Sequence, residues 1–179
     1  VKDDELIQLR RVIYQSMQLS FQRGKLEFNP FIKSGSGRTF DYGPNLDIIP
    51  KVNTAYEQAM KEDLRNADHI STGYRNLIRQ EIYTLYSHGK MEDASRLYKQ
   101  LGEQFPDKLI IDGDTNSFPR NVTLEQFVIA AVGVDVSETS RDRVQAAIEG
   151  FCMSSFREII LGNKDRATAL RGMARLLQS

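Results

Sequence analysis

Three oxygen-bearing side chains, Asp112, Asp114 and Asn116, stand at alternate positions of the chain. This is the spacing of the first three ligands in calcium-binding loops, which coordinate the ion through oxygen atoms. The remaining positions do not match such a loop, because Ser117 replaces the usual glycine and Thr123 stands where a bidentate Glu is expected. We therefore predict a hydrated turn rich in Asp and Asn, and no metal site.

A second stretch, Ser34-Gly-Ser-Gly-Arg38-Thr39, has glycines and a basic residue that could bring backbone N–H groups close to a phosphate. It lacks the Gly-Lys-Ser/Thr ending of a nucleotide-binding loop, so a surface loop is the better interpretation. Arg38, Phe40 and Tyr42 remain candidate contact residues, either with the core or with a partner.

Side chains for acid–base or nucleophilic chemistry are present but scattered. His69 and His88 are the two histidines, and neither has a His or Cys at metal-ligand spacing. Glu81, Glu92 and Asp93 are expected to be solvated charges on helix surfaces. We therefore predict no catalytic residue, no cofactor and no enzyme activity.

Composition further narrows the classes of protein to which the chain could belong. Lys plus Arg and Asp plus Glu both number 24, so no net charge draws the chain to nucleic acid, and no such partner is predicted. A single cysteine, Cys152, rules out a disulfide within the chain. The longest apolar run, 127–136, is too short to span a bilayer, which takes roughly 20 residues.

The start of the chain bears on localisation, which is otherwise unknown. It reads Val-Lys-Asp-Asp rather than beginning with Met, and it has no basic segment followed by an apolar one. This favours a soluble piece of a longer protein, exported or tethered to a membrane.

Apolar residues at steps of three and four predict an all-α chain of about seven helices. In the first, 4–22, the stripe of Leu6, Leu9, Ile13, Met17 and Phe21 is expected to face the core, with Arg11 and Gln18 on the other side. The other helices are expected over 50–64, from 72 to Gly89, from 91 to Pro106, over 123–132, from 141 to Gly162, and over 167–177.

Turn residues separate these helices within one predicted domain, 1–179. A long loop is expected at 28–49, and an irregular segment at 107–121, with no strand beyond a doubtful one at 108–111. Pro50 is expected in the first turn of its helix, and Thr123-Leu-Glu-Gln126 has the form of a capping box.

The stretch 75–108 resembles a tetratricopeptide repeat. It has the length of that repeat, and Gly89, Ala94, Tyr98 and Pro106 fall where the pattern of its second half expects them. The first half of the pattern is not matched, and elsewhere in the chain the similarity to such a repeat is weak. The resemblance implies a degenerate superhelix of helical hairpins, with an irregular helical bundle as the alternative.

The resemblance also implies a binding surface. In its register Asn76, Arg79, Tyr83 and Tyr86 line the inner groove, where such repeats bind peptides. Tyrosine offers a large contact area and arginine pairs with carboxylates, so an extended or acidic segment is expected there. Packing of the two tyrosines on neighbouring helices is the competing interpretation.

We therefore expect a non-catalytic adaptor or scaffold module that binds a protein or peptide. The alternative is a module that binds a carbohydrate or another small ligand, or a remote enzyme, with the loop 29–45 as a lid over a pocket.

Overall fold

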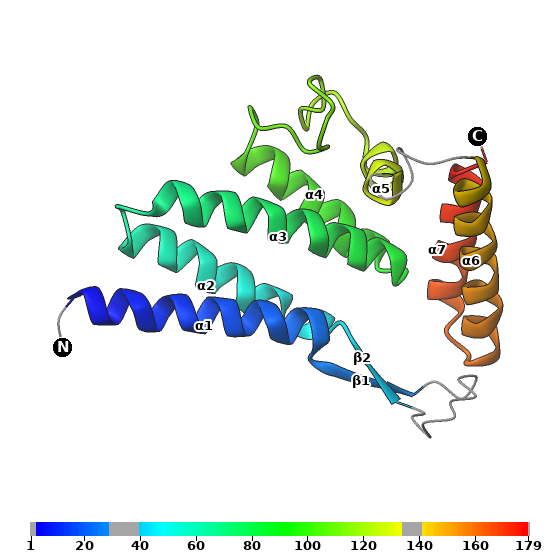
Figure 1. The fold of residues 1–179 in the computed structure, drawn as a ribbon, viewed down its shortest axis with the longest axis horizontal. Helices are drawn as coiled ribbons and strands as arrows, with labels where there is room; N and C mark the ends of the chain where they lie inside the picture. The colour runs from blue at the N-terminus through cyan, green and yellow to red at the C-terminus, as the bar shows by residue number, and fades with distance from the viewer. Residues whose placement is uncertain (1–2, 29–39, 134–140, 179) are drawn as a thin grey trace. The chain divides into compact units, whose positions relative to one another are not determined.

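The computed structural model describes residues 3–28, 40–133 and 141–178. As predicted, it is all-α, and the described residues form seven α-helices. They divide into two compact units, Val1–Leu77 and Ile78–Ser179, with one helix, α3 (Ala67–Ser87), running from the first into the second. Figure 1 gives the order of the elements along the chain. No helix in the described ranges is long and apolar enough to cross a membrane.

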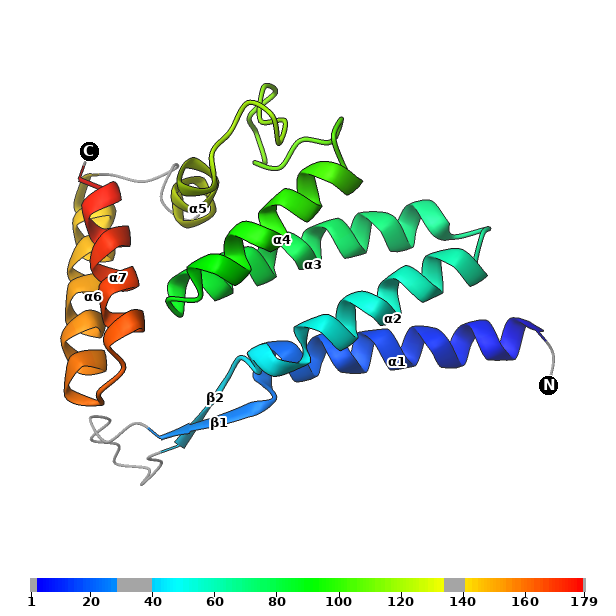
Figure 2. The ribbon, with the colours of Figure 1, turned by 180° about the vertical axis from the view of Figure 1, so that it is seen from behind.

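The first unit is built on an antiparallel pair of helices. Helices α1 (Asp3–Arg23) and α2 (Ile49–Glu62) lie side by side in both Figure 1 and Figure 2. Pro50 stands in the first turn of α2, as predicted, where its missing N–H leaves no helical bond unmade. Just before α2 the chain is held against the end of α1 by a hydrogen bond from Asn45 N to Phe21 O, which is 2.7 Å long.

The orientation of α1 differs from the predicted one. Phe21 is buried as expected, but Leu9 and Ile13 are 58% and 54% exposed. The face that meets the core instead carries Tyr14, which packs on Tyr56 of α2, and Arg11, which pairs with Asp63. The prediction was wrong because it assigned faces by hydropathy alone, whereas a tyrosine ring and an ion pair fix this helix.

The segment predicted as a loop at 28–49 contains regular structure. Strands β1 (Lys25–Phe28) and β2 (Phe40–Gly43) pair antiparallel, with Lys25 opposite Gly43, and a short 3-10 helix η1 (Leu46–Ile48) leads into α2. Four-residue strands carry too little alternation to stand out from a Gly- and Ser-rich sequence. The middle of the predicted loop, 29–39, lies outside the described residues.

The second unit begins with a helical hairpin. The second half of α3 turns at Gly89 into α4 (Met91–Gln104), which ends just before Pro106. Gly89 has a φ of +76°, and a Cβ there would lie 2.6 Å from the backbone carbonyl carbon of Asp165. Glycine is therefore needed both for the left-handed conformation and for the close approach of the backbone near Asp165.

Helices α5 (Leu124–Gly133), α6 (Arg141–Ile160) and α7 (Lys164–Leu176) complete this unit. The predicted capping box is confirmed, since Gln126 N donates to Thr123 Oγ1 and Thr123 N donates to Gln126 Oε1. Helices α6 and α7 form a second hairpin, in which the buried Ser155 donates to Ala167 O over 2.8 Å. The helix starts at Ala67 and Lys164 precede the predicted starts at 72 and 167.

Side chains of α4 hold the irregular segment that follows it. Ala94 is fully buried, and Tyr98 packs on Phe127 and donates its hydroxyl proton to Val122 O over 2.6 Å. The segment 108–111 is not a strand; there Ile110 N donates to Ser117 O within a compact turn.

Glu81 of α3 is buried, contrary to the expectation of a solvated charge.

Replacing Gly89 should destabilise the protein more than replacing another left-handed glycine. Gly162 has a φ of +81° with no atom within 4 Å of its ideal Cβ, so Gly162→Ala should cost about 1–2 kcal/mol of unfolding free energy. Gly89→Ala adds a clash with backbone and should cost about 2–4 kcal/mol. Chemical denaturation of both variants measures the difference, and equal losses would contradict the close approach.

Tyr98 should contribute an alkaline dependence of stability. Desolvation, followed by the charge of Glu125, raises the pKa of Tyr98 from 10.0 to about 12. A phenol whose pKa is raised by folding stabilises the fold below pH 10, and this contribution is lost as the pH rises toward 12. Tyr98→Phe should lower stability at neutral pH by about 1 kcal/mol and flatten the alkaline decline. Denaturation at several pH values tests this, and an unchanged slope would contradict it.

Candidate functional site

An open cleft of about 450 Å³ lies in the first unit, which is within the usual range for ligand sites. Its walls come from α1, from α2, from the start of α3 and from the turn before it. The lining residues are Arg11, Tyr14, Gln15, Tyr56, Asn66, His69, Ile70 and Gly73. None of them belongs to the set that the sequence analysis selected.

The floor of the cleft is aromatic. The rings of Tyr14 and Tyr56 have centroids 4.5 Å apart, and Tyr56 stacks in turn on the fully buried Tyr74 at 5.5 Å. The Tyr56 hydroxyl donates to Gln18 Oε1 over 2.6 Å, which holds the ring in place. Burial raises the pKa of the Tyr14 hydroxyl above its ordinary value.

Gly73 keeps the floor accessible. It lies in the interior of α3, and a Cβ there would meet only Tyr56 Cε1, at an ordinary 3.7 Å. Packing therefore does not require glycine, which costs a helix about 1 kcal/mol relative to alanine. A longer side chain at this position would extend into the cleft over Tyr56.

One edge of the cleft is organised by Asp63, at the end of α2. Its carboxylate accepts from Arg11 Nη2 over 3.0 Å and from Asn66 Nδ2 over 2.9 Å. Hydrogen bonding to Asn66, with a further contribution from Arg11, lowers the pKa of Asp63. The carboxylate therefore keeps its charge to a more acidic pH than an ordinary aspartate, and it fixes the turn between α2 and α3 that presents Asn66 and His69.

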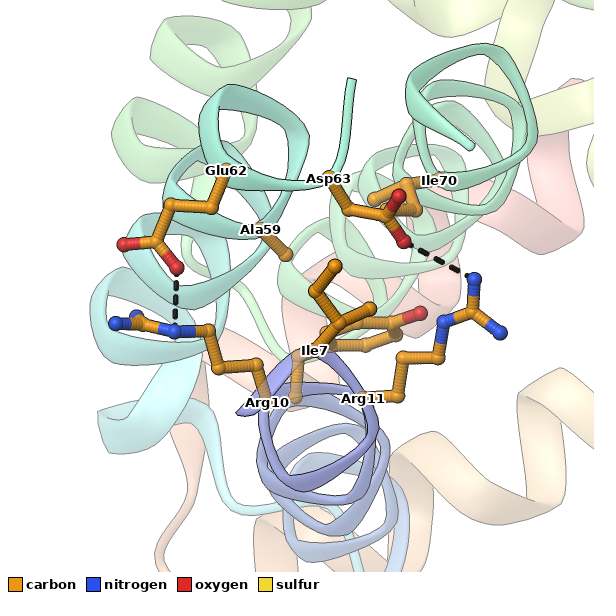
Figure 3. A pocket seen from close by; sticks show the side chains of 8 residues that line it. Ile7, Arg10, Arg11, Ala59, Glu62, Asp63 and Ile70 are labelled. Atoms are coloured by element: carbon orange, nitrogen blue, oxygen red, sulfur yellow. Dashed lines mark hydrogen bonds and ion pairs between the residues drawn. The ribbon is translucent and has the colours of Figure 1, made fainter. Parts of the chain in front are cut away.

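Next to this edge the helices are tightly closed. Figure 3 shows Ile7 between two ion pairs, Arg11 with Asp63 and Arg10 with Glu62. The gap that these side chains surround measures about 10 Å³, which is at most the space of a single water. The open cleft on the other side of Arg11 is thus the part of this region that can admit a ligand.

The predicted binding residues on α3 differ in accessibility. Asn76 is exposed, Arg79 and Tyr83 are half-buried, and Tyr86 is buried at 8% exposure. Burial, with a smaller effect of Glu125, raises the pKa of Tyr86. Within the first unit, Asn76 lies three residues beyond Gly73 and seven beyond His69, so it continues the helix face that borders the cleft.

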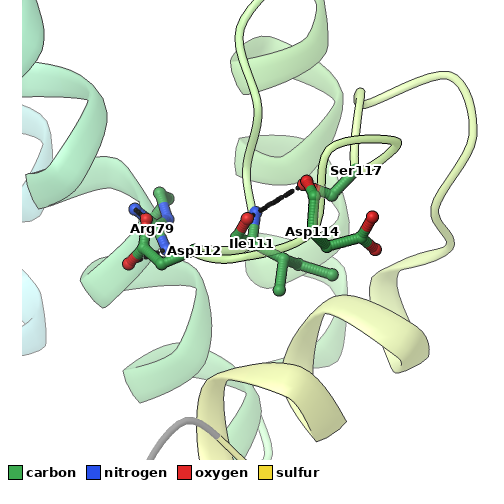
Figure 4. Close-up of polar contacts among 5 residues, drawn as sticks. All are labelled: Arg79, Ile111, Asp112, Asp114 and Ser117. Carbon is green, nitrogen blue, oxygen red and sulfur yellow. Dashed lines mark hydrogen bonds and ion pairs between the residues drawn. The ribbon is translucent and has the colours of Figure 1, made fainter.

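Arg79 belongs to the second unit, where it forms a two-pronged ion pair. Its Nη1 and Nη2 donate to the two carboxylate oxygens of Asp112, over 3.2 and 3.0 Å (Figure 4). The guanidinium side chain is only 18% exposed. A carboxylate of a partner would have to displace Asp112 to reach this arginine in the same way.

The turn that follows Asp112 is held by Ser117, as Figure 4 shows. The Ser117 hydroxyl contacts Ile111 N and the carbonyl oxygens of Ile111 and Asp114, within 3.0 Å. Asn116 N donates to Asp114 Oδ1, so the carboxylate caps its own turn. These contacts fit the predicted Asp- and Asn-rich turn, and no group of metal-ligating side chains occurs among the described residues.

The loop candidates contribute no described contact to the cleft. Arg38 lies outside the described residues, and so does the side chain of Phe40, although its backbone belongs to β2. Tyr42 is 71% exposed on β2.

Sequence reasoning missed the cleft because it placed Arg11, which lines the cleft, on the solvent side of α1. A usable signal was Gly73, a glycine inside a helical pattern, which often marks a packing or functional constraint.

Comparisons with protein-family models, curated proteins and solved structures find no match to this chain.

Proposed function

We propose that this chain is a non-catalytic protein-binding module, which holds a peptide segment of its partner in the cleft between α1 and α3. The observation that carries the proposal is the open cleft of about 450 Å³ with a floor of tyrosine rings. Tyrosine surfaces are enriched where proteins bind one another, because a rigid ring gives a large contact area at a small entropic cost.

The edge of the cleft favours a segment that carries an acidic group. Arg11 lies at this edge with its side chain 31% exposed, Asn66 lies in the turn before α3, and His69 lies in the first turn of α3. The backbone N–H groups at the start of α3 carry partial positive charge, whereas the charge of Arg11 is already paired with Asp63. An extended segment with an aromatic or aliphatic residue beside a carboxylate fits both the floor and the edge.

The proposal includes a helical repeat of the tetratricopeptide kind. Its support is the hairpin of α3 and α4, in which Gly89 makes the turn, Ala94 is buried, and Pro106 follows the second helix. In such repeats the first helix of each hairpin lines the binding groove. Asn76, Arg79, Tyr83 and Tyr86 of α3 remain proposed contacts on that basis.

The alternative of a small-ligand site or an enzyme with a lid formed by 29–45 has less support. The residues that line the cleft come from α1, α2, α3 and the turn at Asn66, and none comes from the described end of that loop, 40–45.

Filling the cleft should weaken peptide binding. We expect selection from a displayed random peptide library to enrich acidic and aromatic segments on the wild-type chain. Gly73→Gln should weaken binding of those peptides at least about tenfold, because the added side chain covers Tyr56. Isothermal titration with the enriched peptides gives the affinities.

The matched control is Gly150→Gln. Gly150 also lies inside a helix, α6, and no atom stands within 4 Å of its ideal Cβ. Both variants replace a helical glycine by a better helix former, so thermal stability should not fall in either. Gly150→Gln should bind like wild type. Equal affinity of Gly73→Gln and wild type would place the site elsewhere, and the failure of wild type to enrich any peptide would overturn the proposed function.

A further inference from the structure

The outer face of α1 carries five large apolar side chains that the first unit leaves exposed. Each is between 43% and 61% exposed, and they are Leu6, Leu9, Val12, Ile13 and Leu19. The charged residues in this part of the helix, Arg10 and Arg11, form ion pairs with Glu62 and Asp63 of the neighbouring helix. Between Leu6 and Leu19 the exposed face is therefore apolar and carries no unpaired charge, which is characteristic of an interaction surface.

The spacing along this face is that of a coiled coil. Leu6, Leu9 and Ile13 follow one another at steps of three and four, and Ser16 and Ser20 continue the same pattern. This alternation keeps one seam of a helix in contact with a partner helix over its whole length. Large side chains thus occupy the first half of the seam and small ones the second half.

We propose that the occupant of this face is the α1 helix of a second copy of the chain, packed antiparallel about a two-fold axis at Ile13. Leu6 and Ser20 both lie seven residues from Ile13, so the axis brings Leu6 of one copy to Ser20 of the other. Each leucine then meets a small residue, and the two helices can approach closely. A two-fold axis requires such a self-complementary face.

Charge favours the same direction. The first three residues of α1 are Asp3, Asp4 and Glu5, whereas its other end has Arg23, followed by Lys25. Asp3 and Arg23 each lie ten residues from Ile13, so antiparallel pairing brings the acidic end of one helix to the basic end of the other. Parallel pairing would bring like charges together.

The size of the face fits a reversible dimer. Two copies would together bury on the order of 1,000 Å², near the lower limit for a specific interface. The cleft residues Arg11 and Tyr14 lie on the other side of α1 from the seam residues Leu9 and Ser16, so pairing leaves the floor of the cleft accessible. Self-association and the proposed peptide binding can therefore be tested independently of each other.

Sedimentation over a range of concentrations tests the dimer. Wild type should change from 20.4 kDa to twice that mass as its concentration rises, and Ile13→Glu should weaken association at least about tenfold. The matched control is Phe156→Glu, since Phe156 is an apolar residue on α6 whose exposure of 62% is similar to the 54% of Ile13. Circular dichroism should be unchanged in both variants. A wild type that stays monomeric, or a dimer lost with Phe156→Glu and kept with Ile13→Glu, would overturn the proposal.

Cysteine cross-linking in a Cys152→Ser background tests the direction. A mixture of Leu6→Cys and Ser20→Cys chains should form mainly disulfide-linked heterodimers on mild oxidation, and Ile13→Cys chains should link to themselves. Leu6→Cys chains that link efficiently to one another would show a parallel arrangement and contradict the two-fold axis at Ile13.

Discussion

The contact between the rings of Tyr14 and Tyr56 determines which side of α1 faces α2, and both proposed surfaces depend on it. Phe21, two turns further along α1, is buried on the same side, and Arg11 reaches Asp63 from there. With these residues inside, Gln15 borders the cleft and Leu9 is left on the outer face. One orientation of one helix thus accounts for an open aromatic cleft on one side and an apolar seam on the other.

The Asp63 carboxylate adds a polar constraint to this aromatic one. A buried carboxylate is costly unless it is paired and hydrogen-bonded. Asp63 meets this requirement by joining Arg11 of α1 to Asn66 of the following turn, so three segments share one charged group. Because hydrogen bonds lower its pKa, the group keeps its charge, and with it the shape of the cleft edge, to a more acidic pH than an ordinary aspartate.

Local patterns predicted the helices well and their arrangement less well. The capping box at Thr123, Pro50 at the start of α2 and the turn at Gly89 depend on neighbours in sequence, and all three are confirmed. The orientation of α1 depends on Tyr56 and Asp63, which are roughly 40 to 50 residues away, and hydropathy within one helix has no access to such contacts. The strands β1 and β2 were missed because each is stabilised by the other rather than by its own alternation. The cleft could not be predicted from local patterns either, because its walls come from three helices and depend on contacts between residues distant in sequence.

Hydroxyl-radical footprinting of the wild-type chain, diluted until it is monomeric, measures the orientation of α1 most directly. We predict that Leu9 and Ile13 are oxidised faster than Tyr14 and Phe21, although aromatic rings are intrinsically the more reactive. Rapid oxidation of Tyr14 and Phe21 with protection of Leu9 and Ile13 would mean that α1 presents its leucine stripe to the core. That result would remove both the aromatic floor of the cleft and the outer seam.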